Sequence, residues 1–327
     1  RSTLFPYTTL FRSPAGQQLR LIVGEENIKI DEPMSKHTTF NIGGAARYFL
    51  TVANKAELQA SMQAILAEGS QFFIIGKGSN LLVSDSGYAG VIIKLAGEFN
   101  GVTIKNNHLI AGTGLSLSAL ARKAAGQGLS GLEFAEGISG SVGGAIYMNA
   151  GAYGGQISDS VLNITTLNTN TGEVITISRD MCQFAYRHSI LMEHPLIALQ
   201  AIFALKTGNP QEIKTNMQKF RQLRITKQPL KYPSAGSVFK RGADYHASSL
   251  IEKAGLKGYS IGGAQVSEMH SGFIINTGKA CAMDVYKLIQ HIQQVVKSEY
   301  QVNLEPEIKF LGVFNDKQTA DNKHYVN

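Results

Sequence analysis

The sequence has few cysteines and no long hydrophobic run. Cys182 and Cys281 are its two cysteines, and they lie far apart without CxxC spacing or a neighbouring cluster of histidines. This pattern gives no sign of a disulfide framework or a metal site and fits a reducing compartment. No window approaches the roughly 20 apolar residues of a membrane-spanning helix. We therefore expect a cytoplasmic protein with no metal and no membrane partner.

A dense basic segment is also missing. The formal net charge is +7, of which Arg1 and Arg12 contribute two charges, and the other lysines and arginines are scattered. No aromatic residues are interleaved with them as a stacking platform, so we do not expect nucleic acid as a partner. The modest basic excess suits small anionic ligands.

The length and composition describe an ordinary soluble chain. Its 327 residues, 43% of them hydrophobic and 17% charged, allow two or three compact domains. Residues 1–13 share no pattern with the rest of the chain, and residues 3–13 resemble the translation of a sequencing-library adapter. We interpret residues 1–13 as a non-native leader and not as a targeting signal. At the other end, we expect residues 313–327 to form a polar tail.

The stretch from Glu133 to Gly155 is the most unusual part of the sequence, because seven of its 23 residues are glycine. Glycine allows positive φ and close approach to the main chain, so successive N–H groups can form an anion-binding concavity. A tight packing loop or a small-residue helix contact is the alternative. The length of the stretch and its polar residues Ser139, Ser141 and Asn149 favour a cofactor loop.

A second glycine turn, Gly76–Val83 (G-K-G-S-N-L-L-V), directly follows a predicted buried strand at Phe72–Ile75. It lacks the third glycine of a dinucleotide-binding G-x-G-x-x-G turn, and the sequence has no G-K-[ST] loop of an ATPase. The two loops therefore predict an extended phosphorylated cofactor held by two backbone cradles.

Hydrophobic periodicity and turn residues predict a chain of mixed helices and strands. A shift to a more helical and basic composition places a domain boundary near residue 208. The expected helices cover residues 54–69, 117–127, 209–226, 248–254 and 285–296. The expected strands cover residues 72–75, 90–95, 108–111, 161–167, 173–178, 197–205 and 304–311, with a turn at 234–240.

Seven segments in series, covering about residues 35–312, resemble the UDP-N-acetylenolpyruvoylglucosamine reductase (MurB) family of flavoenzymes. The segments are T-F-N-I-G-G-A-A-R, G-K-G-S-N-L-L-V, G-I-S-G-S-V-G-G-A-I-Y-M-N-A-G-A-Y-G, Y-R-H-S, A-G-S-V-F-K, A-Q-V-S-E-M-H-S-G-F-I-I-N and L-E-P-E-I-K-F.

The resemblance implies an α+β protein that binds FAD non-covalently in a fold of the vanillyl-alcohol-oxidase (PCMH) type. Two FAD-binding subdomains, 19–95 and 96–208, would precede a C-terminal α/β substrate-binding domain at 209–302, with strand 303–312 returning to the first subdomain. The implied reaction uses NADPH to reduce UDP-N-acetylglucosamine-enolpyruvate to UDP-N-acetylmuramate in peptidoglycan synthesis. The oligomeric state is left open.

Three residues match the catalytic positions of the family. Arg187 matches the arginine that grips the substrate carboxylate, a task suited to a planar guanidinium. Ser237 matches the proton donor, and Glu307 matches the carboxylic acid of the final strand. Strand periodicity places Glu305 on the same face, so the physics of the sequence alone does not choose between the two glutamates. If Glu307 donates a hydrogen bond, burial must raise its pKa.

Further ligand contacts are implied in the same way. Lys227, Lys240 and Gln265 match contacts to the nucleotide sugar and its phosphates. The expected FAD contacts are the residues Gly76, Lys77, Gly78, Ser79, Asn80, Leu81, Gly137, Ile138, Ser139, Gly140, Ser141, Gly143, Gly144, Ala145, Asn149 and Gly151.

The sequence departs from the family pattern at three places. Ser139 replaces a usual proline, Arg241-Gly242 replaces a usual N-P, and only 50 positions separate Arg187 from Ser237. The short spacing resembles type II members, which lack the insertion that carries a lid tyrosine.

Two alternative functions are left open. The protein could be another flavin oxidase or dehydrogenase of the same fold, or a non-catalytic protein that binds FAD or a nucleotide sugar.

Overall fold

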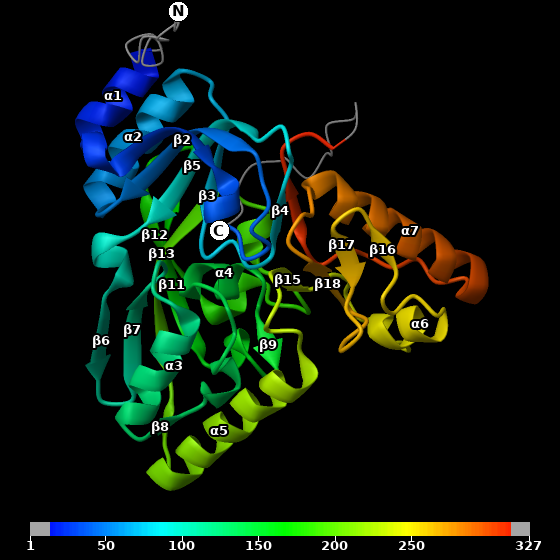
Figure 1. Cartoon of the computed structure of the whole chain (residues 1–327). Helices are drawn as coiled ribbons and strands as arrows, with labels where there is room; N and C mark the ends of the chain where they lie inside the picture. The colour runs from blue at the N-terminus through cyan, green and yellow to red at the C-terminus, as the bar shows by residue number, and fades with distance from the viewer. Residues whose placement is uncertain (1–13, 315–327) are drawn as a thin grey trace, which may run out of the picture.

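The computed structural model describes residues 14–314 of the chain. The predicted leader, 1–13, and residues 315–327 of the predicted tail lie outside the described residues. Three main sheets, each covered by helices, make up the described part (Figure 1). The sheet at the C-terminal side, with helices α6 and α7, stands apart from the other two in this view.

The first sheet has the strand order β1-β2-β5-β3, with β1 antiparallel and the others parallel. Side chains alternate along its strands, so Leu50 faces Leu58 of helix α2, while Phe49 packs on the opposite face with Phe73. The predicted helix at residue 54 is confirmed, because the Asn54 side chain accepts the Glu57 N–H at 2.9 Å. The elements are α1 (Pro14–Val23), β1 (Ile28–Pro33), β2 (Ala45–Val52), α2 (Lys55–Ala67), β3 (Phe72–Ile75) and β5 (Tyr88–Leu95).

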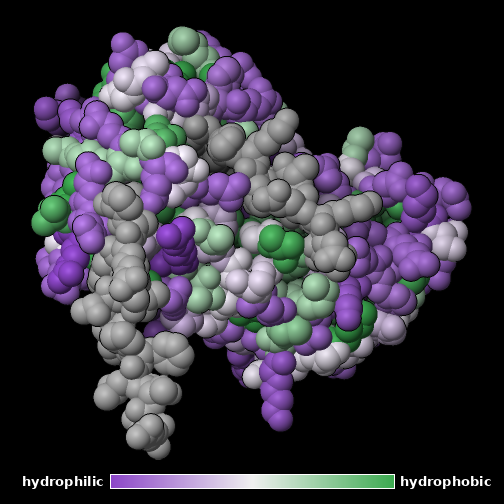
Figure 2. Space-filling model, turned by 90° about the horizontal axis from the view of Figure 1, so that it is seen from above, coloured by the Kyte–Doolittle hydropathy of each residue, from purple (hydrophilic) through white to green (hydrophobic). Residues whose placement is uncertain are grey.

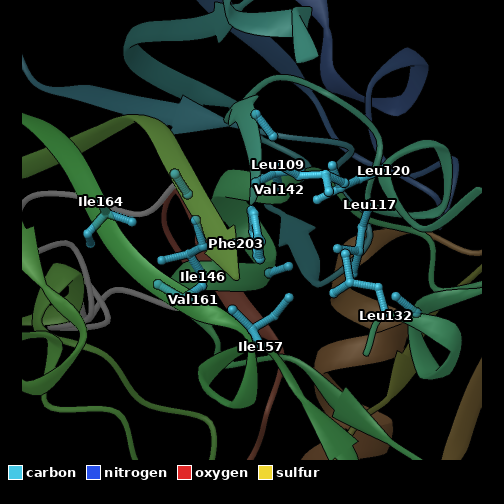
Figure 3. Close-up of a cluster of buried hydrophobic side chains, with 14 of the residues drawn as sticks. Leu109, Leu117, Leu120, Leu132, Val142, Ile146, Ile157, Val161, Ile164 and Phe203 are labelled. Carbon is cyan, nitrogen blue, oxygen red and sulfur yellow. The ribbon is translucent and has the colours of Figure 1, made fainter. Parts of the chain in front are cut away.

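The second sheet is antiparallel, in the order β12-β11-β13-β7-β6, and includes the predicted hairpin of β11 and β12. Phe203 of β13 lies at the centre of its core, surrounded by Leu109, Leu120, Val142 and Ile146 (Figure 3). The elements are β6 (Val102–Lys105), β7 (His108–Gly112), α3 (Leu117–Gly126), α4 (Val142–Tyr147), β11 (Val161–Asn168), β12 (Val174–Ser178) and β13 (Leu196–Ala204). Helix α4 therefore packs the glycine-rich stretch directly onto this core.

The third sheet is antiparallel, in the order β15-β18-β17-β16, and carries α6 and α7. The predicted apolar stripe of α7 is confirmed as core, with Leu288 and Ile292 buried. The turn predicted at 234–240 is wrong, because pairing with β18 extends its first part into a strand with a register shift. The elements are β15 (Ser234–Ser237), α6 (Ala247–Lys253), β16 (Ser260–Ile261), β17 (Ala264–Val266), β18 (Phe273–Asn276) and α7 (Ala282–Tyr300). Helix α5 (Pro210–Lys227) precedes them in the chain but packs against α3 and β8 (Leu129–Ser130), beside the second sheet.

Several contacts join the third sheet to the first part of the chain. The predicted strand at 304–311 is shorter in the structure: only β19 (Lys309–Leu311) is a strand, and it runs parallel to β4 (Leu81–Val83). Asp85 accepts the N–H groups of Ala282 (2.7 Å) and Met283 (2.9 Å), which caps helix α7. Two short pairs complete the described strands: β8 (Leu129–Ser130) with β14 (Lys206–Thr207), and β9 (Gly151–Ala152) with β10 (Gly155–Gln156).

The coloured part of one face of the molecule is mostly hydrophilic (Figure 2). Figure 2 shows purple residues over most of the visible face, with hydrophobic residues in small groups between them. Within residues 14–314, no helix combines the length and the apolar character that crossing a membrane requires.

Candidate active site

A cavity of about 350 Å³ lies between the end of β3, the two glycine loops and strand β15 of the third sheet. Both glycine loops contribute to its wall, as do β15, the turn at Arg187 and the segment before β19. The predicted residues that line it are Gly76, Lys77, Gly78, Ser79, Asn80, Leu81, Gly137, Ile138, Ser139, Gly140, Ser141, Gly144, Ala145, Gly151, Arg187, Ser237 and Glu307. The structure thus brings together most of the residues that the sequence predicts for the site.

The two glycine loops touch each other at one end of this cavity. A Cβ atom on Gly76 would collide with the hydroxyl of Ser141, which accepts the Gly144 N–H at 3.1 Å and so caps α4. Gly78 has a φ of +59°, and a Cβ there would collide with the His37 carbonyl. The Gly76–Val83 loop can pack this closely against Ser141 on one side and His37 on the other only because Gly76 and Gly78 carry no side chain.

The loops also present unused backbone donors. Among residues 14–314, no acceptor is found for the backbone N–H groups of Lys77, Gly78, Ser79, Asn80, Ser139, Gly140 and Ser141. A Cβ on Gly140 would meet no atom closer than the Ser79 hydroxyl oxygen at 3.9 Å, so open space separates the loops there. Because backbone N–H groups in such turns form anion-binding concavities, the arrangement fits a phosphate or diphosphate group.

Two predicted contacts lie behind the cavity wall. The Gly143 N–H donates to the Thr113 carbonyl at 2.8 Å. Asn149 is buried, donates from Nδ2 to the Ala185 carbonyl at 3.0 Å, and accepts the Ser158 N–H at 3.0 Å. In this arrangement both residues support the loops, and Asn149 anchors the turn that carries Arg187.

Arg187 and Glu307 form a pair at the cavity. The Arg187 Nε donates to the Glu307 carboxylate at 2.7 Å, and its Nη2 donates to the Gly151 carbonyl at 3.3 Å. Arg187 has a φ of +56°, an uncommon conformation for a residue with a side chain and one often found at functional sites. Burial raises the pKa of Glu307, and the charge of Arg187 opposes this effect without cancelling it.

The backbone explains why Glu307, and not Glu305, faces the cavity. The Glu307 N–H donates to the Val238 carbonyl at 2.7 Å, and Asn80 donates to the Glu307 carbonyl at 3.1 Å. This segment is not a regular strand, so the two glutamates do not share a face. The Glu307 side chain is 15% exposed, whereas that of Glu305 is 67% exposed and pairs with Lys240 at 2.5 Å.

Ser237 lies at the end of β15, next to the residue that binds the Glu307 backbone. Its side chain is exposed, it lines the cavity, and its hydroxyl has no hydrogen-bond partner among residues 14–314. The hydroxyl is therefore available to a bound molecule.

The three predicted contacts to the nucleotide sugar do not line this cavity. Lys227 ends helix α5, Lys240 pairs with Glu305, and the Gln265 Nε2 donates to the Gly258 carbonyl at 3.2 Å. Their roles stay predictions.

Several lining residues were not predicted from the sequence. They include Thr39, Tyr147, Arg224, Gln228, Phe273 and Lys309. Arg224 belongs to a helix whose residues are mostly polar and exposed, so its pattern in the sequence resembles a solvated face. No signal in the local sequence distinguishes it from its exposed neighbours.

Comparisons with known proteins agree with this geometry. Residues 46–178 match an FAD binding domain family, and residues 228–311 match the C-terminal domain of UDP-N-acetylenolpyruvoylglucosamine reductase. The reductase of that name from Lachnoclostridium phytofermentans is 44% identical over 90% of this chain and 96% of its own length. The reductase from Caldanaerobacter subterraneus is 48% identical over 90% of this chain and 97% of its own length. The crystal structure of the Thermus caldophilus reductase (MurB) has a TM-score of 0.77 at 33% identity, covering 87% of this chain and all of that one.

Proposed function

The chain belongs to the UDP-N-acetylenolpyruvoylglucosamine reductase family, and from this premise we propose that Arg187, Ser237 and Glu307 carry the family's reaction in the cavity. The protein is an FAD-dependent oxidoreductase. It reduces the enolpyruvyl group of UDP-N-acetylglucosamine-enolpyruvate to give UDP-N-acetylmuramate in peptidoglycan synthesis, with NADPH as the reductant.

The two glycine loops would hold the FAD diphosphate. The seven N–H groups without an acceptor in the described part of the chain, and the open space at Gly140, fit an anionic group of this kind. Reduced FAD, when bound, supplies the hydride that is added to the CH₂ carbon of the enolpyruvyl double bond. The remaining tasks fall to the protein: to hold the substrate carboxylate, to stabilise the charge that develops beside it, and to supply a proton.

Arg187 would hold the substrate carboxylate. Two of its N–H groups are used by Glu307 and Gly151, which fix the guanidinium on the cavity wall. The other N–H groups remain for the carboxylate, and a guanidinium can donate two parallel hydrogen bonds to such a group. The positive charge also stabilises the negative charge that develops on the neighbouring carbon.

Glu307 would donate a hydrogen bond to the developing enolate. Only the protonated carboxyl group can do so, and burial shifts the pKa of Glu307 in the direction that favours this form. Ser237 would transfer its hydroxyl proton to the carbon next to the substrate carboxylate, where the negative charge develops after the hydride has been added to the CH₂ carbon. Its hydroxyl is a weak acid, but it needs only to be more acidic than the carbon that it protonates.

The meeting of Arg187, Ser237 and Glu307 on one cavity with both glycine loops carries this proposal. Ser237→Ala and Glu307→Ala should each lower turnover by about 10²- to 10⁴-fold, because each removes a proton-transfer or hydrogen-bonding group. Glu305→Ala is the matched control, since Glu305 is exposed and lies two positions away. FAD absorbance must be retained in all three variants. Unchanged turnover in Ser237→Ala or Glu307→Ala would remove that residue from the mechanism.

The finer assignments belong to the same proposal. We place the FAD-binding subdomains at 19–95 and 96–208 and the substrate domain at 209–302, with Lys227, Lys240 and Gln265 as contacts to the nucleotide sugar. A cytoplasmic location follows from the reaction, since NADPH and nucleotide sugars are supplied there. Nucleic acid is not a proposed partner.

A further inference from the structure

Arg224 is a buried arginine with an unusual environment. It lies on helix α5 and is 8% exposed, while Arg221, one turn earlier on the same helix, is exposed. The Arg224 Nε donates to the Glu136 carbonyl at 2.9 Å, and its Nη2 donates to the Phe134 carbonyl at 3.3 Å. The side chain also lines the cavity of the active site. It thus connects α5 to the start of the glycine-rich stretch Glu133–Gly155.

The guanidinium of Arg224 makes no ion pair in the described part of the chain, although the charge of Glu136 acts on it from a longer distance and opposes the lowering of its pKa. No carboxylate among residues 14–314 lies within ion-pair distance of it. The nearby Glu136 carboxylate is paired with Arg122 at 3.3 Å. Burial lowers the pKa of Arg224, but an arginine keeps its charge in proteins. Because buried charges are normally paired, two neutral carbonyls leave this charge incompletely compensated.

The residues around Arg224 place its guanidinium beside the glycine-rich stretch Glu133–Gly155 and shield it from solvent. A Cβ on Gly137 would lie 2.8 Å from the Arg224 Cδ, so the absence of a side chain there leaves room for the arginine. The guanidinium lies 5.0 Å from the centre of the Tyr153 ring, and that ring stacks on Phe220 at 4.9 Å. Aromatic cover of this kind lowers the local dielectric and strengthens an interaction with an anion.

We propose that Arg224 is a further cofactor-binding residue, whose guanidinium supplies the counter-charge for the diphosphate of FAD. The inference rests on the FAD use of the family. Arg224 adds a fixed positive charge next to a loop whose N–H groups are neutral donors, so the two kinds of group act on the same anion. The substrate also carries a diphosphate, and the experiment must therefore separate the two sources.

The test compares flavin binding by the purified full-length protein, its Arg224→Met variant and the matched Arg221→Met control. Flavin release on dilution, followed by fluorescence, gives the Kd for FAD and, after exchange, for riboflavin, which has no phosphate. We expect Arg224→Met to raise the Kd for FAD by about 10- to 100-fold, the size of a lost charge-assisted hydrogen bond. Riboflavin affinity should stay within about threefold, and Arg221→Met should change neither value by more than that.

The other outcomes overturn the inference. Equal losses of FAD and riboflavin affinity would mean that Arg224 only supports the fold. A loss of UDP binding to the FAD-loaded protein, with FAD affinity unchanged, would assign the charge to the nucleotide sugar. If Arg224→Met does not fold, Arg224→Gln keeps a donor for the carbonyls without the charge and is expected to show the same selective loss of FAD. Failure of the unmodified protein to bind any flavin would instead refute the proposed function.

Discussion

Replacement of Gly140 by alanine should leave the stability of the flavin-free protein unchanged but weaken its binding of FAD. The φ of Gly140 is not in the left-handed region, and an added Cβ would meet no protein atom closer than 3.9 Å. The substitution should therefore leave the protein without FAD as stable as before, or up to about 1 kcal/mol more stable, because alanine restricts the unfolded chain.

The effect on FAD binding should be the opposite. The new methyl group points across the gap towards Ser79 of the other loop, where the diphosphate is expected. Its bulk should cost at least one hydrogen bond between a backbone N–H and a charged phosphate oxygen, about 1.5–3 kcal/mol. This corresponds to an increase in the Kd for FAD of about 10- to 150-fold.

The assay measures the unfolding temperature of the flavin-free protein and the Kd for FAD by flavin fluorescence. Gly126→Ala is the matched control, since Gly126 ends α3, is exposed, and has no atom within 4 Å of an added Cβ. It should keep the FAD affinity of the unmodified protein. The reasoning about the cradle is refuted if Gly140→Ala binds FAD equally well, or if it destabilises the flavin-free protein.

Two further predictions concern single contacts. Asp85→Ala removes the two hydrogen bonds from Asp85 that cap α7 and should lower the free energy of unfolding, measured by urea denaturation, by about 1–2 kcal/mol. The control Asp180→Ala, at an exposed position, should leave the free energy of unfolding unchanged. If Asp85→Ala is as stable as the unmodified protein, Asp85 does not cap α7. Because burial raises the pKa of Glu307, its contribution to stability is present below the ordinary glutamate pKa and is lost as the pH rises through the raised value. The glutamine of Glu307→Gln cannot ionise. The unfolding temperature of this variant minus that of the unmodified protein should therefore increase as the pH rises through this window. A temperature difference that does not change with pH would contradict the raised pKa of Glu307.

Local signals in the sequence predicted much of the fold. The helices expected from residues 54 and 209 are confirmed as α2 and α5, and in the structure each begins after an asparagine whose side chain caps it. The two glycine loops predict parts of one cofactor site, because both combine glycines with small polar residues. Such features depend on residues close together in the chain, which a single sequence contains.

Features set by distant contacts could not be predicted in this way. A regular strand would place Glu305 and Glu307 on the same face, whereas contacts with Asn80 and Val238 give this segment an irregular backbone. Arg224 is buried by a loop 88 positions earlier in the chain, which no periodicity within α5 reveals.

This chain reduces an enolpyruvyl nucleotide sugar with electrons from NADPH. The most direct test follows NADPH absorbance and product formation for the purified, FAD-loaded protein with UDP-N-acetylglucosamine-enolpyruvate. We predict that NADPH is consumed in step with the formation of UDP-N-acetylmuramate, and that sustained consumption stops when the enolpyruvyl substrate is left out. A flavin-loaded protein that forms no UDP-N-acetylmuramate, or that oxidises NADPH at the same rate without the substrate, would contradict the claim.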